Sequence, residues 1–121
     1  MEQRPFGGTG LTVSVVGLGA GQVGEADVTE AEAAALLGTA LDLGVTLVDT
    51  ALSYGTSEER IGRHLRHRRH DFVLSSKGGA GVPGYEDWSP EAVRAGIEQT
   101  LRRTRSERVD VFFLHLSLIH I

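Results

Sequence analysis

Four polar side chains in this sequence belong to the types that hold and move protons, and each follows a predicted strand. They are Asp49, Tyr54, Lys77 and His115. The pKa of a free tyrosine phenol is about 10, too high for easy proton donation near neutral pH. A neighbouring lysine ammonium lowers the pKa of a phenol, and a carboxylate keeps that lysine charged and oriented. A histidine can hydrogen-bond the same substrate oxygen and fix its direction.

Together these groups would form a site that donates a proton to a developing oxyanion. The set holds no serine or cysteine nucleophile, so a cofactor must deliver the hydride for a reduction. Taken singly, each residue has a structural explanation, such as a strand-end cap, a packed rim residue, a solvated lysine or a satisfied core histidine. Their shared position after strand ends favours catalysis, because the carboxyl ends of barrel strands open on one face.

The elements that must position these residues alternate between short apolar strands and helices. A hairpin is predicted over residues 6–13, and strands are predicted at 13–18, 45–48, 72–74 and 109–114. Capping boxes at Thr29–Glu32 and Thr56–Glu59 predict two helix starts, and Gly44 should end the first helix. Strands alternating with helices indicate a parallel sheet with right-handed crossovers.

The third helix is predicted to begin at Ser89, with Pro90 in its first turn. Val93, Ile97 and Leu101 are spaced by four residues, which predicts that they face inward. In the second helix the same spacing predicts that Ile61 and Leu65 are buried.

Several of these segments resemble the aldo-keto reductases in order and spacing. The matching motifs are Gly17-Leu18-Gly19, Val48-Asp49-Thr50-Ala51, Tyr54-Gly55, Ser57-Glu58-Glu59-Arg60-Ile61-Gly62, Ser75-Ser76-Lys77-Gly78 and Asp110-Val111-Phe112-Phe113-Leu114-His115. The resemblance implies a (β/α)8 TIM barrel that binds NADPH across its open face and reduces an aldehyde or ketone to an alcohol.

The resemblance also implies a role for each residue of the site. Tyr54 would be the general acid, Lys77 would lower its pKa, Asp49 would support Lys77, and His115 would orient the carbonyl. The loop Gly19, Ala20 and Gly21, together with Asp49, would lie near the nicotinamide.

The expected domain organisation is a single partial domain over residues 1–121. A (β/α)8 barrel typically needs about 250 residues, so the fold class expected is α/β, the N-terminal half of such a barrel preceded by a β-hairpin. Residues 118–121 do not fit the expected loop and helix, and they are interpreted as a non-native tail. We expect the fragment alone to be inactive and to self-associate through its sheet edges.

Composition restricts the classes of partner. The net charge is -4 and the chain contains no cysteine, which argues against nucleic-acid binding, disulfides and zinc–thiolate sites. No apolar run is long enough to cross a membrane, so a cytoplasmic location is expected. The expected partner is a small-molecule carbonyl substrate, with no metal, no membrane and no obligate protein partner.

Three other patterns leave alternatives open. Gly19 to Gly24 matches G-x-G-x-x-G, but a dinucleotide-binding helix would start directly on those glycines, whereas the helix signal comes at Thr29. His64, His67 and His70 could form a metal or RNA patch, although a solvated basic helix end is favoured. Trp88 could line the substrate mouth or cover the barrel top, and covering is slightly favoured.

A second class of function also remains open from the sequence. A relative that binds cofactor without turnover could use the same barrel as a cofactor-sensing or regulatory module. The intact set of four residues argues against that alternative, but only weakly.

Overall fold

The computed structural model describes residues 1–116 and begins with the expected β-hairpin. Strands β1 (Gln3–Pro5) and β2 (Thr12–Ser14) pair antiparallel. The intervening turn closes with a hydrogen bond from the Phe6 N–H to the Leu11 carbonyl at 2.8 Å. The paired strands therefore flank the predicted segment 6–13, which is mostly the turn itself. The predicted tail 118–121 lies outside the described residues.

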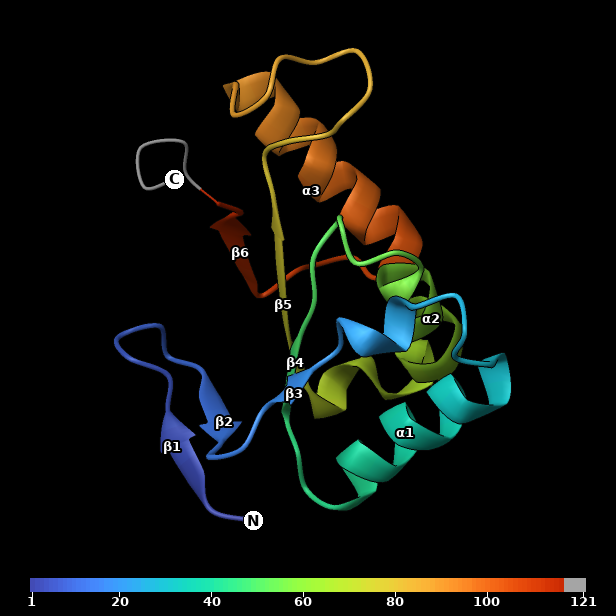
Figure 1. Ribbon diagram of the computed structural model, residues 1–121. Helices are drawn as coiled ribbons and strands as arrows, with labels where there is room; N and C mark the ends of the chain where they lie inside the picture. The colour runs from blue at the N-terminus through green and yellow to red at the C-terminus, as the bar shows by residue number, and fades with distance from the viewer. Residues whose placement is uncertain (117–121) are drawn as a thin grey trace.

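Four parallel strands form the central sheet in sequence order (Figure 1). They are β3 (Leu18–Gly19), β4 (Leu47–Asp49), β5 (Val73–Gly78) and β6 (Val111–Leu114). In this register Gly19 pairs with Asp49 and Asp49 with Ser75. The register thus places the ends of β3 and β4 level with Ser75, and β5 continues beyond them to Gly78.

The single strand predicted over residues 13–18 is wrong. The chain turns between β2 and β3, where the Ser14 hydroxyl donates to the Val16 carbonyl at 2.6 Å. The turn leaves Val15 and Val16 exposed by 44% and 54%. An apolar run does not by itself distinguish a buried strand from a turn that joins two sheets.

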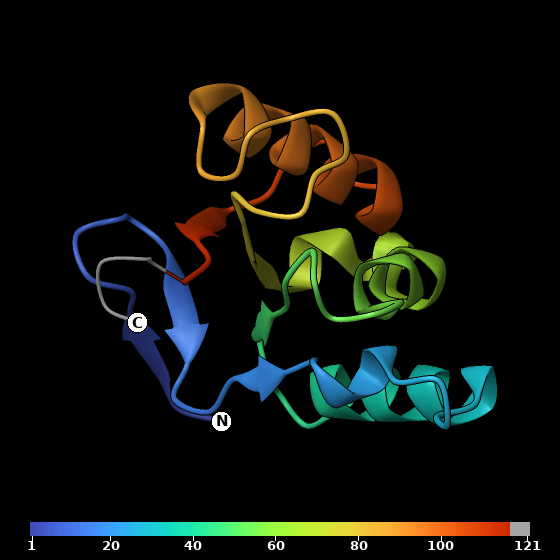
Figure 2. The same cartoon turned by 45° about the horizontal axis from the view of Figure 1, so that its top comes forward.

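The α-helices of residues 1–116 lie together along one side of the sheet, and Figure 2 shows them beside one another. The first, α1 (Glu30–Asp42), begins with the predicted capping box: the Thr29 hydroxyl accepts from the Glu32 N–H at 3.1 Å, and the Glu32 carboxylate accepts from the Thr29 N–H at 2.9 Å. The chain leaves α1 through Gly44, whose φ of +95° favours glycine.

The second helix, α2 (Ser57–Leu65), begins where predicted but without a capping box. The Thr56 hydroxyl instead donates to the Gly24 carbonyl at 3.3 Å, which joins the loop before α2 to the segment between β3 and α1. Ile61 and Leu65 are buried as predicted. A 3-10 segment (Arg66–Asp71) follows, and the short 3-10 turn Gln22–Gly24 precedes α1.

The third helix, α3 (Pro90–Thr104), begins with the predicted cap, the Ser89 hydroxyl accepting from the Ala92 N–H at 3.1 Å. The predicted inward face is wrong, because Val93, Ile97 and Leu101 are only half-buried. The buried residues are small: Ala92, Gly96, Thr100 and Thr104. Close approach of α3 to α2 and β5 requires small side chains there, and this constraint is absent from a pattern based on hydrophobicity.

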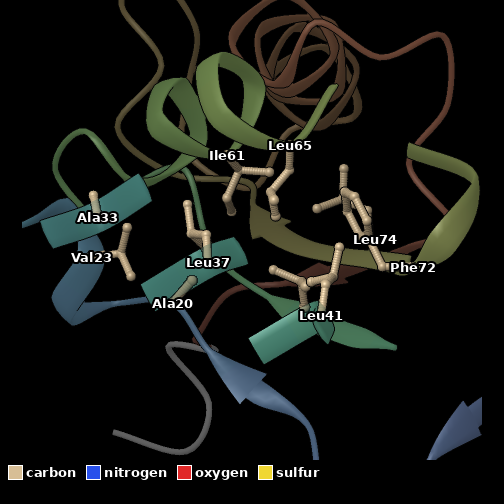
Figure 3. Close-up of a cluster of buried hydrophobic side chains, with 10 residues drawn as sticks. Ala20, Val23, Ala33, Leu37, Leu41, Ile61, Leu65, Phe72 and Leu74 are labelled. Carbon is tan, nitrogen blue, oxygen red and sulfur yellow. The ribbon is translucent and has the colours of Figure 1, made fainter. Parts of the chain in front are cut away.

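The apolar core lies between α1, α2 and the sheet (Figure 3). Leu37, Val48 and Leu74 are fully buried in it. It also contains Ala20, Val23, Ala33, Leu41, Ile61, Leu65 and Phe72. The loop after β3 thus contributes to the core, which holds that loop close to the sheet edge. Among residues 1–116, no helix has the length and apolarity needed to span a bilayer.

Candidate active site

Asp49 and Lys77 form an ion pair at the carboxyl ends of β4 and β5. The Lys77 ammonium donates to the Asp49 carboxylate at 2.7 Å and to the Thr50 carbonyl at 2.8 Å. The other carboxylate oxygen of Asp49 accepts from the Ser75 hydroxyl at 2.8 Å. Ser75 and Lys77 are two residues apart on one strand and therefore share a face. Two direct contacts hold the ammonium in one place, and the Ser75 hydroxyl fixes the carboxylate that it binds.

Tyr54 lies beside this ion pair, on the loop between β4 and α2. The Lys77 ammonium is 5.1 Å from the centroid of the Tyr54 ring. The loop is fixed by backbone contacts, since the Tyr54 N–H donates to the Ala51 carbonyl at 3.2 Å and the Ser57 N–H donates to the Tyr54 carbonyl at 2.9 Å. Gly55 has a φ of +53°, which lets the chain turn back toward α2.

His115 completes the group from the end of β6. Its ring meets the Tyr54 ring edge-to-face, with centroids 5.8 Å apart and planes at 89°. Its backbone N–H donates to the Gly78 carbonyl at 2.8 Å, and its Nδ1 lies 3.4 Å from the Ser53 hydroxyl. Partial burial and, secondarily, the Lys77 charge lower the pKa of His115, while Asp49 opposes the shift. The imidazole is therefore neutral near neutral pH.

The loop Gly19, Ala20 and Gly21 borders the same group of residues. The Ala20 N–H donates to the Asp49 carbonyl at 2.8 Å, and the Ala20 carbonyl accepts from the Ser57 hydroxyl at 2.7 Å. A Cβ on Gly21 would be 3.6 Å from the Tyr54 ring, whereas one on Gly19 would meet nothing within 4 Å. Gly21 thus packs against Tyr54, and Gly19 leaves open space beside Asp49.

Arg60 of α2 anchors the segment between β3 and α1, and sequence analysis did not predict this role. Its guanidinium is largely buried and donates to the carbonyls of Val23 (2.5 Å), Glu25 (3.1 Å) and Val28 (2.7 Å). An arginine next to two glutamates in a predicted helix suggests an exposed ion pair, so no pattern in the sequence pointed to these carbonyls. Ser75 could have been found, since strand alternation places it on the face of Lys77.

The histidine-rich segment has a structural role in this fold. His64 Nε2 is 2.7 Å from the Glu30 carboxylate. Arg69 pairs with Asp110 at 2.7 Å, and both side chains are about nine-tenths buried, with exposures of 11% and 10%. Arg63, Arg66, His67 and His70 are exposed, in agreement with the expected solvated basic helix end. In addition, His64 and Arg69 tie α1 and the start of β6 to α2.

Trp88 lies over the end of β6. Its indole N–H donates to the Leu116 carbonyl at 3.0 Å, with the His115 carbonyl at 3.4 Å. Its φ of +61° is unusual for a tryptophan, and its backbone N–H is bonded to the Gly79 carbonyl. These contacts agree with the expectation that Trp88 covers this end of the sheet.

Parallel strands with polar side chains gathered at their carboxyl ends are typical of α/β barrels. The sequence model of the Aldo/keto reductase family matches residues 15–117, and the chain belongs to that family. The predicted family and barrel class are thereby confirmed.

Three similar proteins illustrate the match. L-galactose dehydrogenase of Arabidopsis thaliana is 36% identical over 95% of this chain and 38% of its own length. A Pseudomonas aeruginosa structure assigned as an aldo-keto reductase is 42% identical, with a TM-score of 0.85 over 95% of this chain and 47% of that one. A Klebsiella pneumoniae aldo/keto reductase in complex with NADP and acetate is 30% identical, with a TM-score of 0.71 over 85% of this chain and 35% of that one.

The chain therefore spans less than half the length of these relatives. The remainder of each relative has no counterpart in the 121 residues. The activity of the whole protein is accordingly a proposal.

Proposed function

We propose that the whole protein reduces an aldehyde or ketone to an alcohol with NADPH. The observation that carries this proposal is the Lys77 ammonium, held 2.7 Å from Asp49 and 5.1 Å from the centroid of the Tyr54 ring. A phenol beside a fixed positive charge is suited to give up its proton to a substrate oxygen. Asp49, Tyr54, Lys77 and His115 are the proposed catalytic set.

Tyr54 is the proposed proton donor. As its proton moves to the substrate oxygen, negative charge develops on the phenol oxygen, and the neighbouring Lys77 ammonium stabilises that charge. Asp49 acts through Lys77, because the ion pair and the Ser75 hydroxyl fix the ammonium beside the ring. Asp49 is therefore a supporting group and does not receive the proton itself.

His115 is proposed to orient the carbonyl group. A neutral imidazole carries one N–H, and its Nε2 is left for the substrate because Nδ1 faces the Ser53 hydroxyl at 3.4 Å. The lowered pKa of His115 favours the neutral form of the ring. The substrate oxygen would then receive a hydrogen bond from His115 and a proton from Tyr54.

The cofactor proposed for this site is NADPH, which when bound supplies the hydride. Gly19, Ala20, Gly21 and Asp49 are the residues of this chain proposed to lie against the nicotinamide. The open space at Gly19 supports this, since a flat ring could approach the backbone beside Asp49. The NADP complex of the Klebsiella relative supports NADPH as the form used.

The substrate is proposed to be a small carbonyl compound. A hollow beside Tyr54 is bordered by Gly21, Gln22, Ser53 and Thr56, among other residues of the two loops. We expect residues 1–121 alone to show no reductase activity, because they cover less than half the length of the relatives and supply four strands of the barrel.

Oxidation of NADPH by the whole protein with a generic aldehyde tests the proposal. Multiple turnovers, followed by the loss of absorbance of NADPH, are expected. Tight binding of NADPH without turnover on any of a panel of aldehydes and ketones would contradict reduction, and it would favour a cofactor-sensing module instead.

A further inference from the structure

A buried carboxylate lies outside the proposed site, on the first turn of α2. Glu58 is only 1% exposed. One of its oxygens accepts from the hydroxyls of Ser76 at 2.7 Å and Thr100 at 2.6 Å. The other oxygen lies 3.3 Å from the Arg103 guanidinium. A buried carboxylate is stable only with such partners, so these contacts form one connected unit.

This unit binds β5 on the face opposite the proposed site. Ser76 immediately precedes Lys77, and successive side chains of a strand point to opposite faces. On one face Glu58 binds Ser76, and on the other face Asp49 binds both Ser75 and Lys77. Two carboxylates therefore hold β5, one on each face. They bind Ser75, Ser76 and Lys77, and so fix the position of Lys77.

Arg103 extends the unit to the loop that carries Tyr54. Its guanidinium donates to the Leu52 carbonyl at 3.1 Å as well as to Glu58. The Leu52 N–H donates to the Lys77 carbonyl at 3.0 Å. Leu52 is thus held at both of its backbone polar groups, from β5 on one side and from α3 on the other. Tyr54 follows two residues later.

We propose that Arg103, together with Glu58, is a positioning residue that sets Tyr54 against Lys77. This inference rests on the proposed function, because the separation that Arg103 would set is the one between the proposed proton donor, Tyr54, and the Lys77 ammonium. Arg103 acts through Leu52 and Glu58 and does not touch the substrate. A planar guanidinium suits the task, since it can donate to Leu52 and Glu58 at once, with a further contact to Glu59 at 3.2 Å.

The test compares three variants of the whole protein. Arg103→Met removes all of these contacts. Arg103→Lys keeps a positive charge near Glu58 but replaces the guanidinium by a single ammonium. Arg102→Met removes an exposed arginine from the same turn of α3 and serves as the control. Two quantities are measured: the NOE between the Tyr54 and His115 rings, and kcat separately from KM.

The proposal predicts that both Arg103 variants weaken the ring–ring NOE and lower kcat by about 10- to 100-fold with little change in KM. Arg102→Met should behave as the parent. If Arg103→Met does not fold, Arg103→Lys decides, because its charge still compensates Glu58. A folded Arg103 variant with an undiminished NOE and parental kcat overturns the proposal. If the parent itself fails to reduce carbonyls, the proposed function falls, and the NOE alone still decides whether Arg103 positions Tyr54.

Discussion

Gly62 of α2 lies directly against the backbone of Arg103 of α3. A Cβ added at Gly62 would come within 2.2 Å of the Arg103 carbonyl oxygen, a separation that no real contact allows. The two helices therefore approach each other along backbone atoms. This approach explains why the buried face of α3 is made of small residues, and it brings Arg103 within reach of Glu58 and Leu52.

Gly62→Ala should destabilise the fold, because the helices must separate to admit the methyl group. We expect a loss of about 1–3 kcal/mol in the free energy of unfolding, typical of overpacking. Gly38→Ala is the matched control: Gly38 is inside α1, and a Cβ there meets nothing within 4 Å. That substitution should stabilise by roughly 0.5–1 kcal/mol. Urea denaturation measures both, and equal effects of the two variants would contradict this account of the α2–α3 contact.

The titration of His115 gives a second prediction. Burial and the Lys77 charge lower its pKa below 6.5 in the folded state. The neutral ring therefore contributes stability that is present above the unfolded pKa and is lost as pH falls through the lower folded pKa. An NMR titration should place the midpoint below 6.5, and Lys77→Met should move the midpoint upward. Arg94→Met, which removes an exposed charge of α3, should leave it unchanged. A midpoint above 6.5 in the parent would refute the assignment.

The lowered pKa of Glu30 predicts a loss of stability at acid pH. Hydrogen bonds from Arg63, His64 and Arg60 outweigh partial desolvation and lower the pKa of Glu30 from 4.5 to about 2. Because the folded-state pKa is depressed, the contribution is fully present above pH 4.5 and is lost as pH falls toward about 2. Glu30→Gln should lower stability at neutral pH and flatten this acid loss, as measured by urea denaturation across the pH range. The exposed Glu107→Gln is the control, and an unchanged acid profile in Glu30→Gln would be the contrary result.

The two outer strands of the sheet predict the behaviour of the 121-residue chain on its own. In the described residues β3 and β6 end the sheet, and Phe113 and Leu114 of β6 are exposed by 48% and 57%. Unpaired strand edges with apolar side chains promote association. Sedimentation velocity should therefore show self-association, with no measurable reductase activity. A soluble monomer with a cooperative melt would show that the two edges are stable without further strands.

Local signals in the sequence predicted the elements but not every contact made by their residues. The same capping-box pattern occurs at Thr29 and at Thr56. At Thr29 it forms, and within residues 1–116 the hydroxyl hydrogen-bonds only to the Glu32 N–H. At Thr56 the hydroxyl binds the Gly24 carbonyl, and Glu59 pairs with Arg103. At the start of α2, tertiary contacts of Thr56 and Glu59 therefore replace the local hydrogen bonds of a capping box.

The gathering of Asp49, Tyr54, Lys77 and His115 could be predicted because it depends on topology. Parallel strands bring their carboxyl ends to the same end of the sheet, wherever the residues lie in the sequence. Arg60, Glu58 and Arg103 could not be predicted in the same way. Charged residues in amphipathic helices usually face solvent, and only the packing of α2 against α3 and the loops shows that these three are buried or bridging.

The central claim is that Tyr54 gives its proton to the substrate oxygen, and Tyr54→Phe in the whole protein tests it most directly. The substitution keeps the ring that packs against Gly21 and His115 and removes only the hydroxyl. NADPH oxidation with an aldehyde should fall by on the order of 10²–10⁴-fold in kcat while cofactor binding is retained. Turnover close to that of the parent would contradict the role assigned to Tyr54.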